Sequence, residues 1–161
     1  MKTILAPIDF SSVTDRIAHE AIQLAKLLHG HVVLLHVVQL PAIVRDVLPV
    51  IDDTAAIIQN ADKSADGKLA QLKKGLRQKF AAIDVVRLNG SPTACILEQA
   101  AKYGVPYIVI GSHGHNPVYD MLVGSTTSGV LKKAPCPVLI IPSAREEAPA
   151  AERREAALAT P

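Results

Sequence analysis

Residues 32–38 read Val-Val-Leu-Leu-His-Val-Val, and this run restricts the possible folds more than any other segment. A continuous β-branched stretch of this kind, interrupted only by His36, predicts a strand that is buried on both faces. Such strands belong to parallel sheets whose two surfaces are covered by helices. The run therefore predicts a central strand of an α/β sheet.

The rest of the chain alternates between strand-like and helix-like patterns of apolar residues. Short apolar runs predict strands at 3–8, 32–38, 83–88, 107–110 and 136–141, and helical spacing fills the segments between them. Ser12 and Asp15 resemble a capping box that opens the first helix. The long second helix, residues 51–80, carries a basic face that includes Lys68, and this face is interpreted as solvated. Strict alternation predicts a doubly wound α/β fold, a five-stranded parallel sheet with helices on both faces.

Length and composition limit the number of domains and the class of partner. The 161 residues, 49% of them hydrophobic, suit one domain over 1–142, and residues 143–161 lack a hydrophobic period and are expected to be a flexible tail. A net charge of +2 and 3% aromatic residues argue against nucleic-acid binding. No run reaches the ~18 apolar residues of a membrane span, and the N-terminus does not resemble a signal peptide, so we expect a cytoplasmic protein with no membrane partner.

Two predicted strands end in unusual residues. The first ends at Asp9, and the fourth ends at Gly111-Ser112-His113-Gly114, followed by Gly124-Ser125-Thr126 at a helix start. The glycines allow a close approach of the backbone, and helix-start amides with the Ser125 and Thr126 hydroxyls can bind phosphate. Asp9 can accept from a ribose hydroxyl or help to hold Mg²⁺ on the phosphates, and Val37 can meet a purine.

Simpler interpretations of the same residues stay open. The glycines can be turn residues only, and Asp9 or Ser125 can be a helix cap. The chain lacks a P-loop, a glycine-rich dinucleotide turn and a nucleophile elbow, so no catalytic residue is assigned. His113 and His115 are two residues apart without further zinc ligands nearby, so no metal site built from the protein alone is expected. Cys95 and Cys136 are expected to be small buried residues.

Several segments together resemble the universal stress protein family. They are the glycine signature Gly111-x2-Gly114-x9-Gly124-Ser125, the opening Ile4–Ser12, Leu35–Val37, Asn89–Pro92 and Ala134–Pro142. The resemblance implies strand order 3-2-1-4-5, ATP binding by members with the complete signature, and homodimers paired through the last strand. Carried over by position, it implies nucleotide contacts from Pro7, Ile8, Asp9, Val37, Gly111, His113, Gly114, Gly124, Ser125 and Thr126. His115 stands where many members have Lys or Arg, so AMP or ADP could compete with ATP.

Three functions remain as hypotheses. The first is an ATP-binding sensor or regulator of the stress response with little or no turnover. The second is a slow ATPase or adenylate-transferring enzyme, which the lack of Lys or Arg near the predicted phosphate site disfavours. The third is a nucleotide-free dimerisation module. Pro135, Pro137 and Pro142 predict that the last strand lies at a sheet edge, and its apolar residues Val138–Ile141 predict pairing with a second copy.

Overall fold

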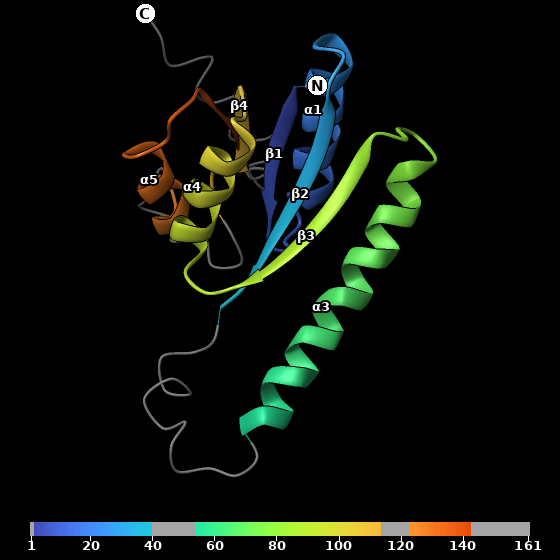
Figure 1. The fold of residues 1–161 in the computed structure, drawn as a ribbon, viewed down its shortest axis with the longest axis vertical. Coiled ribbons are helices and arrows are strands. Elements are labelled where there is room, and N and C mark those ends of the chain that lie inside the picture. Colours follow the sequence, from blue (N-terminus) through green and yellow to red (C-terminus); the bar gives the residue numbers. More distant parts are fainter. Residues whose placement is uncertain (1, 40–53, 114–122, 143–161) are drawn as a thin grey trace, which may run out of the picture.

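The structure is a computed structural model that describes residues 2–39, 54–113 and 123–142. Strands and helices alternate along it (Figure 1): β1 (Thr3–Ile8), α1 (Thr14–Leu27), β2 (His31–Val38), α3 (Thr54–Arg77), β3 (Ile83–Asn89), α4 (Pro92–Tyr103), β4 (Tyr107–Gly111), α5 (Ser125–Leu131) and β5 (Val138–Ile141). Every predicted strand is present. The proposed tail, 143–161, lies outside the described residues.

The strands form one parallel sheet in the order β3-β2-β1-β4-β5. Ile4 pairs with Val32 and Ile8 pairs with His36, so β1 and β2 end at the same level. The predicted fold class and strand order are confirmed. The apolar run of β2 lies between β1 and β3, and both β3 and the proline-flanked β5 are edge strands, as predicted.

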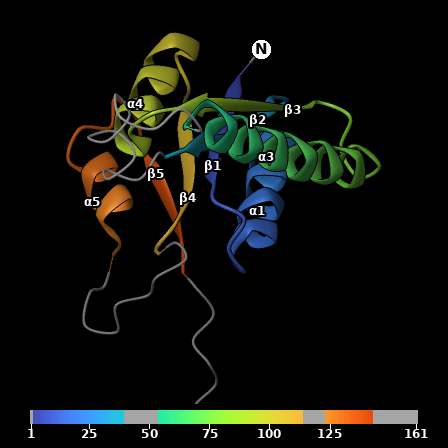
Figure 2. The ribbon, with the colours of Figure 1, turned by 90° about the horizontal axis from the view of Figure 1, so that it is seen from below.

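Helices cover both faces of the sheet. Helices α1 and α3 lie on one face, where α1 residues such as Ile17 and Ala21 pack on Ile4 and Leu34. Helices α4 and α5 lie on the other (Figure 2), where Ile96 and Val130 pack on Leu5 and Ile108. The alternate residues of β1 thus serve two separate apolar cores, which is why its sequence is apolar from Ile4 to Ile8.

The turn between β1 and α1 differs from the prediction. Helix α1 begins at Thr14 with Val13 as its N-cap and no side-chain capping bond, so the expected capping box of Ser12 and Asp15 is wrong. The Asp9 carboxylate instead accepts the Ser11 amide at 3.0 Å and turns the chain before the helix. The next residue, Phe10, has a left-handed backbone with φ of 62°.

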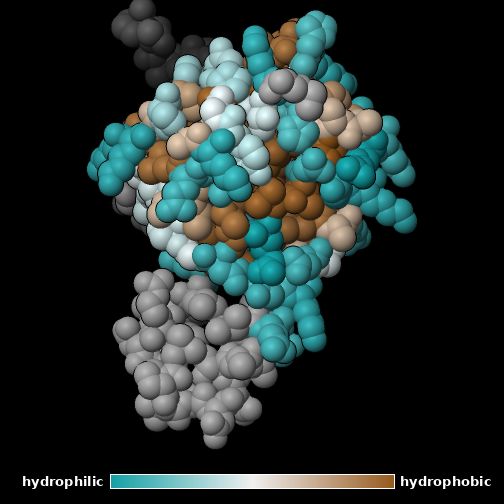
Figure 3. All heavy atoms as spheres, viewed as in Figure 1, coloured by the Kyte–Doolittle hydropathy of each residue, from teal (hydrophilic) through white to brown (hydrophobic). Residues whose placement is uncertain are grey.

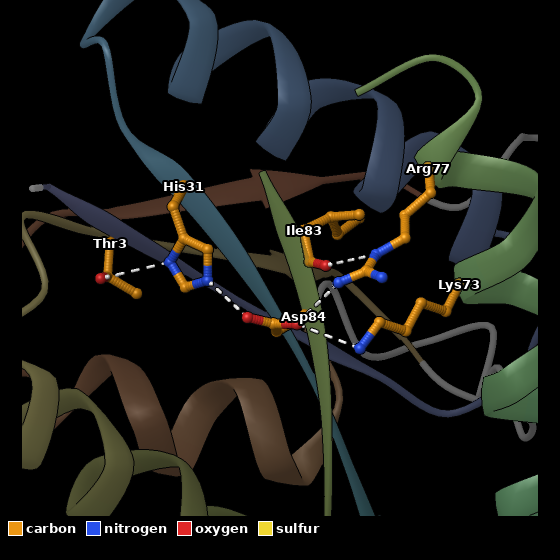
Figure 4. Close-up of polar contacts among 6 residues, drawn as sticks. All are labelled: Thr3, His31, Lys73, Arg77, Ile83 and Asp84. Atoms are coloured by element: carbon orange, nitrogen blue, oxygen red, sulfur yellow. Dashed lines mark hydrogen bonds and ion pairs between the residues drawn. The ribbon is translucent and has the colours of Figure 1, made fainter. Parts of the chain in front are cut away.

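Helix α3 is shorter than predicted and is tied to β3 by ion pairs. It ends at Arg77 rather than residue 80, and residues 51–53 lie outside the described ranges. Asp84 on β3 accepts from Lys73 at 3.0 Å, Arg77 at 3.4 Å and His31 on β2 at 3.3 Å (Figure 4). The basic face of α3 is therefore only partly a solvated surface.

Apolar side chains gather over the part of the sheet between α4 and α3 (Figure 3). Val86 and Leu88 of the edge strand β3 are only partly buried against the core under α4. Within the described ranges, no helix has the length and apolar character needed to cross a membrane.

Candidate functional site

Strands β1 and β4 lie side by side at the middle of the sheet, and the chain leaves them in opposite directions. After β1 it enters α1 on one face, and after β4 it leads to α5 on the other. Two neighbouring parallel strands whose connections diverge leave a crevice beyond their carboxyl ends. Asp9 follows the first of these strands, and Ser112 and His113 follow the second.

A cavity of about 410 Å³ lies in this crevice. Its lining comes from the ends of β1, β2 and β4 and from the starts of α1, α4 and α5, and we call it the ligand cavity. It is lined by Pro7, Ile8, Asp9, Val13, Ile17, Leu35, Val37, Gln39, Pro92, Ile96, Ile110, Gly111, His113, Gly124, Ser125, Thr126 and Thr127. A volume in this range is typical of small-molecule sites.

The cavity brings together nearly all residues that the sequence singled out. Its lining includes Pro7, Ile8, Asp9, Val37, Gly111, His113, Gly124, Ser125 and Thr126. Gly114 and His115, which were also singled out, lie outside the described residues. Asp9, just after β1, and Ser125 of α5 are far apart in the chain, but both line the ligand cavity.

The segment around α5 is held to β4 by short hydrogen bonds. The Gly124 amide donates to the Ser112 carbonyl at 2.7 Å, and the buried Thr127 hydroxyl donates to the Gly111 carbonyl at 2.7 Å. The Ser112 amide donates to the Ile141 carbonyl of β5 at 2.8 Å. These bonds fix the start of α5, whose first amides have no partner within the helix, beside the end of β4.

Gly111 and Gly124, the two described glycines of the predicted signature, have different roles. At Gly111 a Cβ would lie 3.0 Å from Val13 Cγ1 and 3.3 Å from Ile17 Cδ1, so a side chain would press on α1. At Gly124 a Cβ would meet only ordinary contacts, the nearest at 3.4 Å from the Ser112 carbonyl. Gly124 also has φ of −65°, a backbone open to any residue. What glycine provides at 124 is therefore space for a close approach, rather than a special backbone conformation.

Part of the apolar lining of the cavity was not predicted from the sequence. Leu35, Ile96 and Ile110 line it but read as ordinary core residues, because each falls in an apolar run or on a helix face. Thr127 was also missed, since its bond to Gly111 depends on tertiary structure. Pro92 does have a recognisable sequence signal, because a proline that follows a strand often marks the first residue of a helix.

Neither cysteine has an activated thiol. Burial raises the pKa of the Cys95 thiol, with a smaller contribution from the charge of Glu98, and burial also raises the pKa of Cys136. Raised values keep both thiols protonated and weakly nucleophilic. Cys95 is buried as predicted, whereas Cys136 is only half-buried. Within residues 2–39, 54–113 and 123–142, no group of three potential ligands could hold a metal ion.

The fold and the cavity define an open, doubly wound α/β protein with a ligand site where its strand connections diverge. The chain belongs to the universal stress protein family, whose model matches residues 1–142. The universal stress protein MJ0577 of Methanocaldococcus jannaschii is 31% identical over 153 residues, which cover 87% of this chain and 94% of that protein.

Solved structures agree with this assignment. A structure of MJ0577 covers 90% of this chain and 98% of its own at 28% identity, with a TM-score of 0.78. An Archaeoglobus fulgidus universal stress protein in complex with dAMP is 22% identical, with a TM-score of 0.62 over 88% of this chain and 98% of its own. A universal stress protein in complex with cAMP is 20% identical, with a TM-score of 0.56 over 87% of this chain and 95% of its own. The last two show a shared fold.

Proposed function

We propose that this chain is a cytoplasmic, ATP-binding regulator of the stress response that turns its nucleotide over slowly or not at all. The observation that carries this proposal is that one cavity is lined both by Asp9, whose carboxylate follows β1, and by the start of α5, which lies beside the end of β4. Two structures of the same fold hold the adenine nucleotides dAMP and cAMP, which supports a nucleotide as the ligand.

The lining suggests how each part of a nucleotide is bound. Val37, Leu35 and Ile96 offer an apolar surface for adenine, and Asp9 can accept from a ribose hydroxyl. The amides and hydroxyls of Ser125 and Thr126 are donors for phosphate oxygens. The proposed contact set is completed by Pro7, Ile8, Gly111, His113, Gly114 and Gly124.

The charges of the side chains around the ligand cavity favour slow turnover. No Lys or Arg is among the described residues that line the cavity, and residues 114–122 contain none. Phosphate charge would then be balanced by Mg²⁺, with Asp9 as a candidate ligand, rather than by a basic side chain. Phosphoryl transfer depends on such charge stabilisation, so we assign no catalytic residue. AMP and ADP remain competitors for the site.

Calorimetry with ATP and Mg²⁺ tests the proposal. We expect wild-type protein to bind and Asp9→Ala to bind about tenfold more weakly, because one hydrogen bond to a charged group is worth ~1.5 kcal/mol. Gly124→Val should weaken binding strongly, since its side chain would fill space beside Ser112 and His113, and Gly124→Ala is the smaller matched change. No binding at millimolar ATP would overturn the proposal.

We further propose that the domain over 1–142 forms a homodimer through β5, with 143–161 as a flexible tail. Strand β5 is an edge strand, and Leu139 on it is 41% exposed. An edge with unpaired backbone groups and apolar side chains favours pairing with a second strand.

A further inference from the structure

Phe10 lies between the ligand cavity and a second groove of the molecule. Its neighbour Asp9 lines the ligand cavity, whereas Phe10 lines a separate groove of about 1340 Å³ between α1 and α3. Lys68 and Leu72 of α3 line the same groove. None of the described residues of α3 lines the ligand cavity, so among the described residues a connection between the cavity and α3 needs an intermediate residue.

Contacts from two elements hold the Phe10 ring. Its centroid lies 4.4 Å from that of the His36 ring on β2, with 44° between the ring planes. The ammonium of Lys68 on α3 lies 5.4 Å from the ring centroid, within the range of a cation–π interaction. The ring also packs against the core on that face, to which Leu72 and Leu76 of α3 contribute.

His36 is itself held by the end of β1. Its Nδ1 lies 2.9 Å from the Ile8 carbonyl, and because a carbonyl only accepts, Nδ1 donates this bond. Ile8, Asp9 and Phe10 are consecutive, and the Asp9 carboxylate accepts the Ser11 amide. The position of the Phe10 ring and the position of the Asp9 carboxylate are therefore set by one short turn.

The backbone of Phe10 is strained in this turn. A bulky residue at φ of 62° is strained and persists only while its surroundings hold it there. A ligand bound to Asp9 and a helix α3 that holds the ring would both favour the left-handed state. Two events that stabilise the same strained state promote each other.

We infer that Phe10 couples nucleotide binding in the ligand cavity to the packing of helix α3, so that bound ATP holds α3 against the sheet. This inference rests on the proposed function and deepens it by naming how occupancy of the site is transmitted to the surface. Phe10 is here a positioning residue, because it lines the groove rather than the ligand cavity.

Hydrogen exchange of the full chain, with and without MgATP, tests the coupling. We expect ATP to slow exchange of the α3 amides between residues 62 and 77 by about fivefold, the lower end of the usual range of coupling between sites. Phe10→Gly and Phe10→Ala should both abolish this protection, because both lack the ring. Only glycine adopts the left-handed backbone without strain, so Phe10→Gly should bind ATP several-fold more tightly than Phe10→Ala.

A second pair of variants leaves Phe10 in place. Lys68→Met removes the cation above the ring and keeps an apolar side chain, and it should reduce the ATP-dependent protection of α3 by at least half. Lys74→Met is the matched control, since Lys74 is an exposed residue of the same helix that does not line the groove. It should leave the protection at the wild-type value.

The outcomes separate the two proposals. If the wild-type chain binds no ATP by calorimetry, the proposed function fails and the coupling fails with it. If ATP binds and exchange of α3 does not change, the coupling alone is overturned. Protection that persists in Phe10→Gly and in Lys68→Met would likewise overturn it, because α3 would then respond without the ring and its cation.

Discussion

At the scale of single residues, Gly111 and Gly124 should differ in what they tolerate. Gly111→Ala would place a methyl group 3.0 Å from Val13 Cγ1, and we expect the free energy of unfolding to fall by about 1–2 kcal/mol. Gly124→Ala meets contacts no closer than 3.4 Å and should change it by less than about 0.5 kcal/mol. Urea denaturation of the two variants measures the difference, and equal losses would contradict this account.

The candidate site was predictable where chemistry interrupts a simple pattern. Asp9 and Gly111 attract notice because each ends an apolar run, and Ser125 because it opens a helix after a glycine. Phe10 carries no such signal: its left-handed backbone and its place beside His36 depend on contacts between β1 and β2. A residue can be predicted from the sequence when its chemical type suggests its role. It cannot be predicted when its role depends on contacts made only in the folded structure.

At the scale of elements, the attachment of α3 to β3 should depend on pH. The hydrogen bond from Lys73, and next that from His31, lower the pKa of Asp84. A lowered pKa in the folded state adds stability above the ordinary aspartate pKa of about 3.9, and this contribution disappears as the pH falls through the lowered value.

Asp84→Asn should therefore destabilise the protein near neutral pH and have no effect in acid. The carboxylate is 52% exposed, so solvent screening limits the loss to about 0.5 kcal/mol. Thermal unfolding of wild type and variant across the acidic range measures the difference, and added salt should reduce it. A constant difference at every pH would show that packing, rather than charge, connects α3 to β3.

The elements themselves were largely readable from periodicity, whereas their order in the sheet was not. Alternation of strands and helices predicts a parallel sheet but allows many strand orders, and the order 3-2-1-4-5 came from the resemblance to a family. The start of α1 was misjudged because Ser12 has a typical capping residue type, while the turn at Asp9 delays the helix to Thr14. Local signals cannot rank two competing turns.

At the scale of the whole molecule, the proposed dimer predicts a sensitive position on β5. Leu139→Lys would add a charge to the apolar edge, and we expect light scattering at micromolar concentration to give a dimer for wild type and a monomer for the variant. Leu27→Lys is the matched control, because Leu27 is 78% exposed at the end of α1 and far from β5 in the chain. A wild-type monomer would contradict the dimer.

The parallel sheet also determines where a label can be attached without obstructing the ligand cavity. All five strands run the same way, so Thr3 enters at the edge remote from the cavity, and Pro142 leaves β5 at the edge where the cavity opens. The Arg16 guanidinium donates to the Pro142 carbonyl at 2.8 Å and anchors this exit beside α1. A fluorophore or surface tether joined ahead of Thr3 would start on the remote side, and one joined just after Pro142 would start on the same side of the sheet as the ligand cavity.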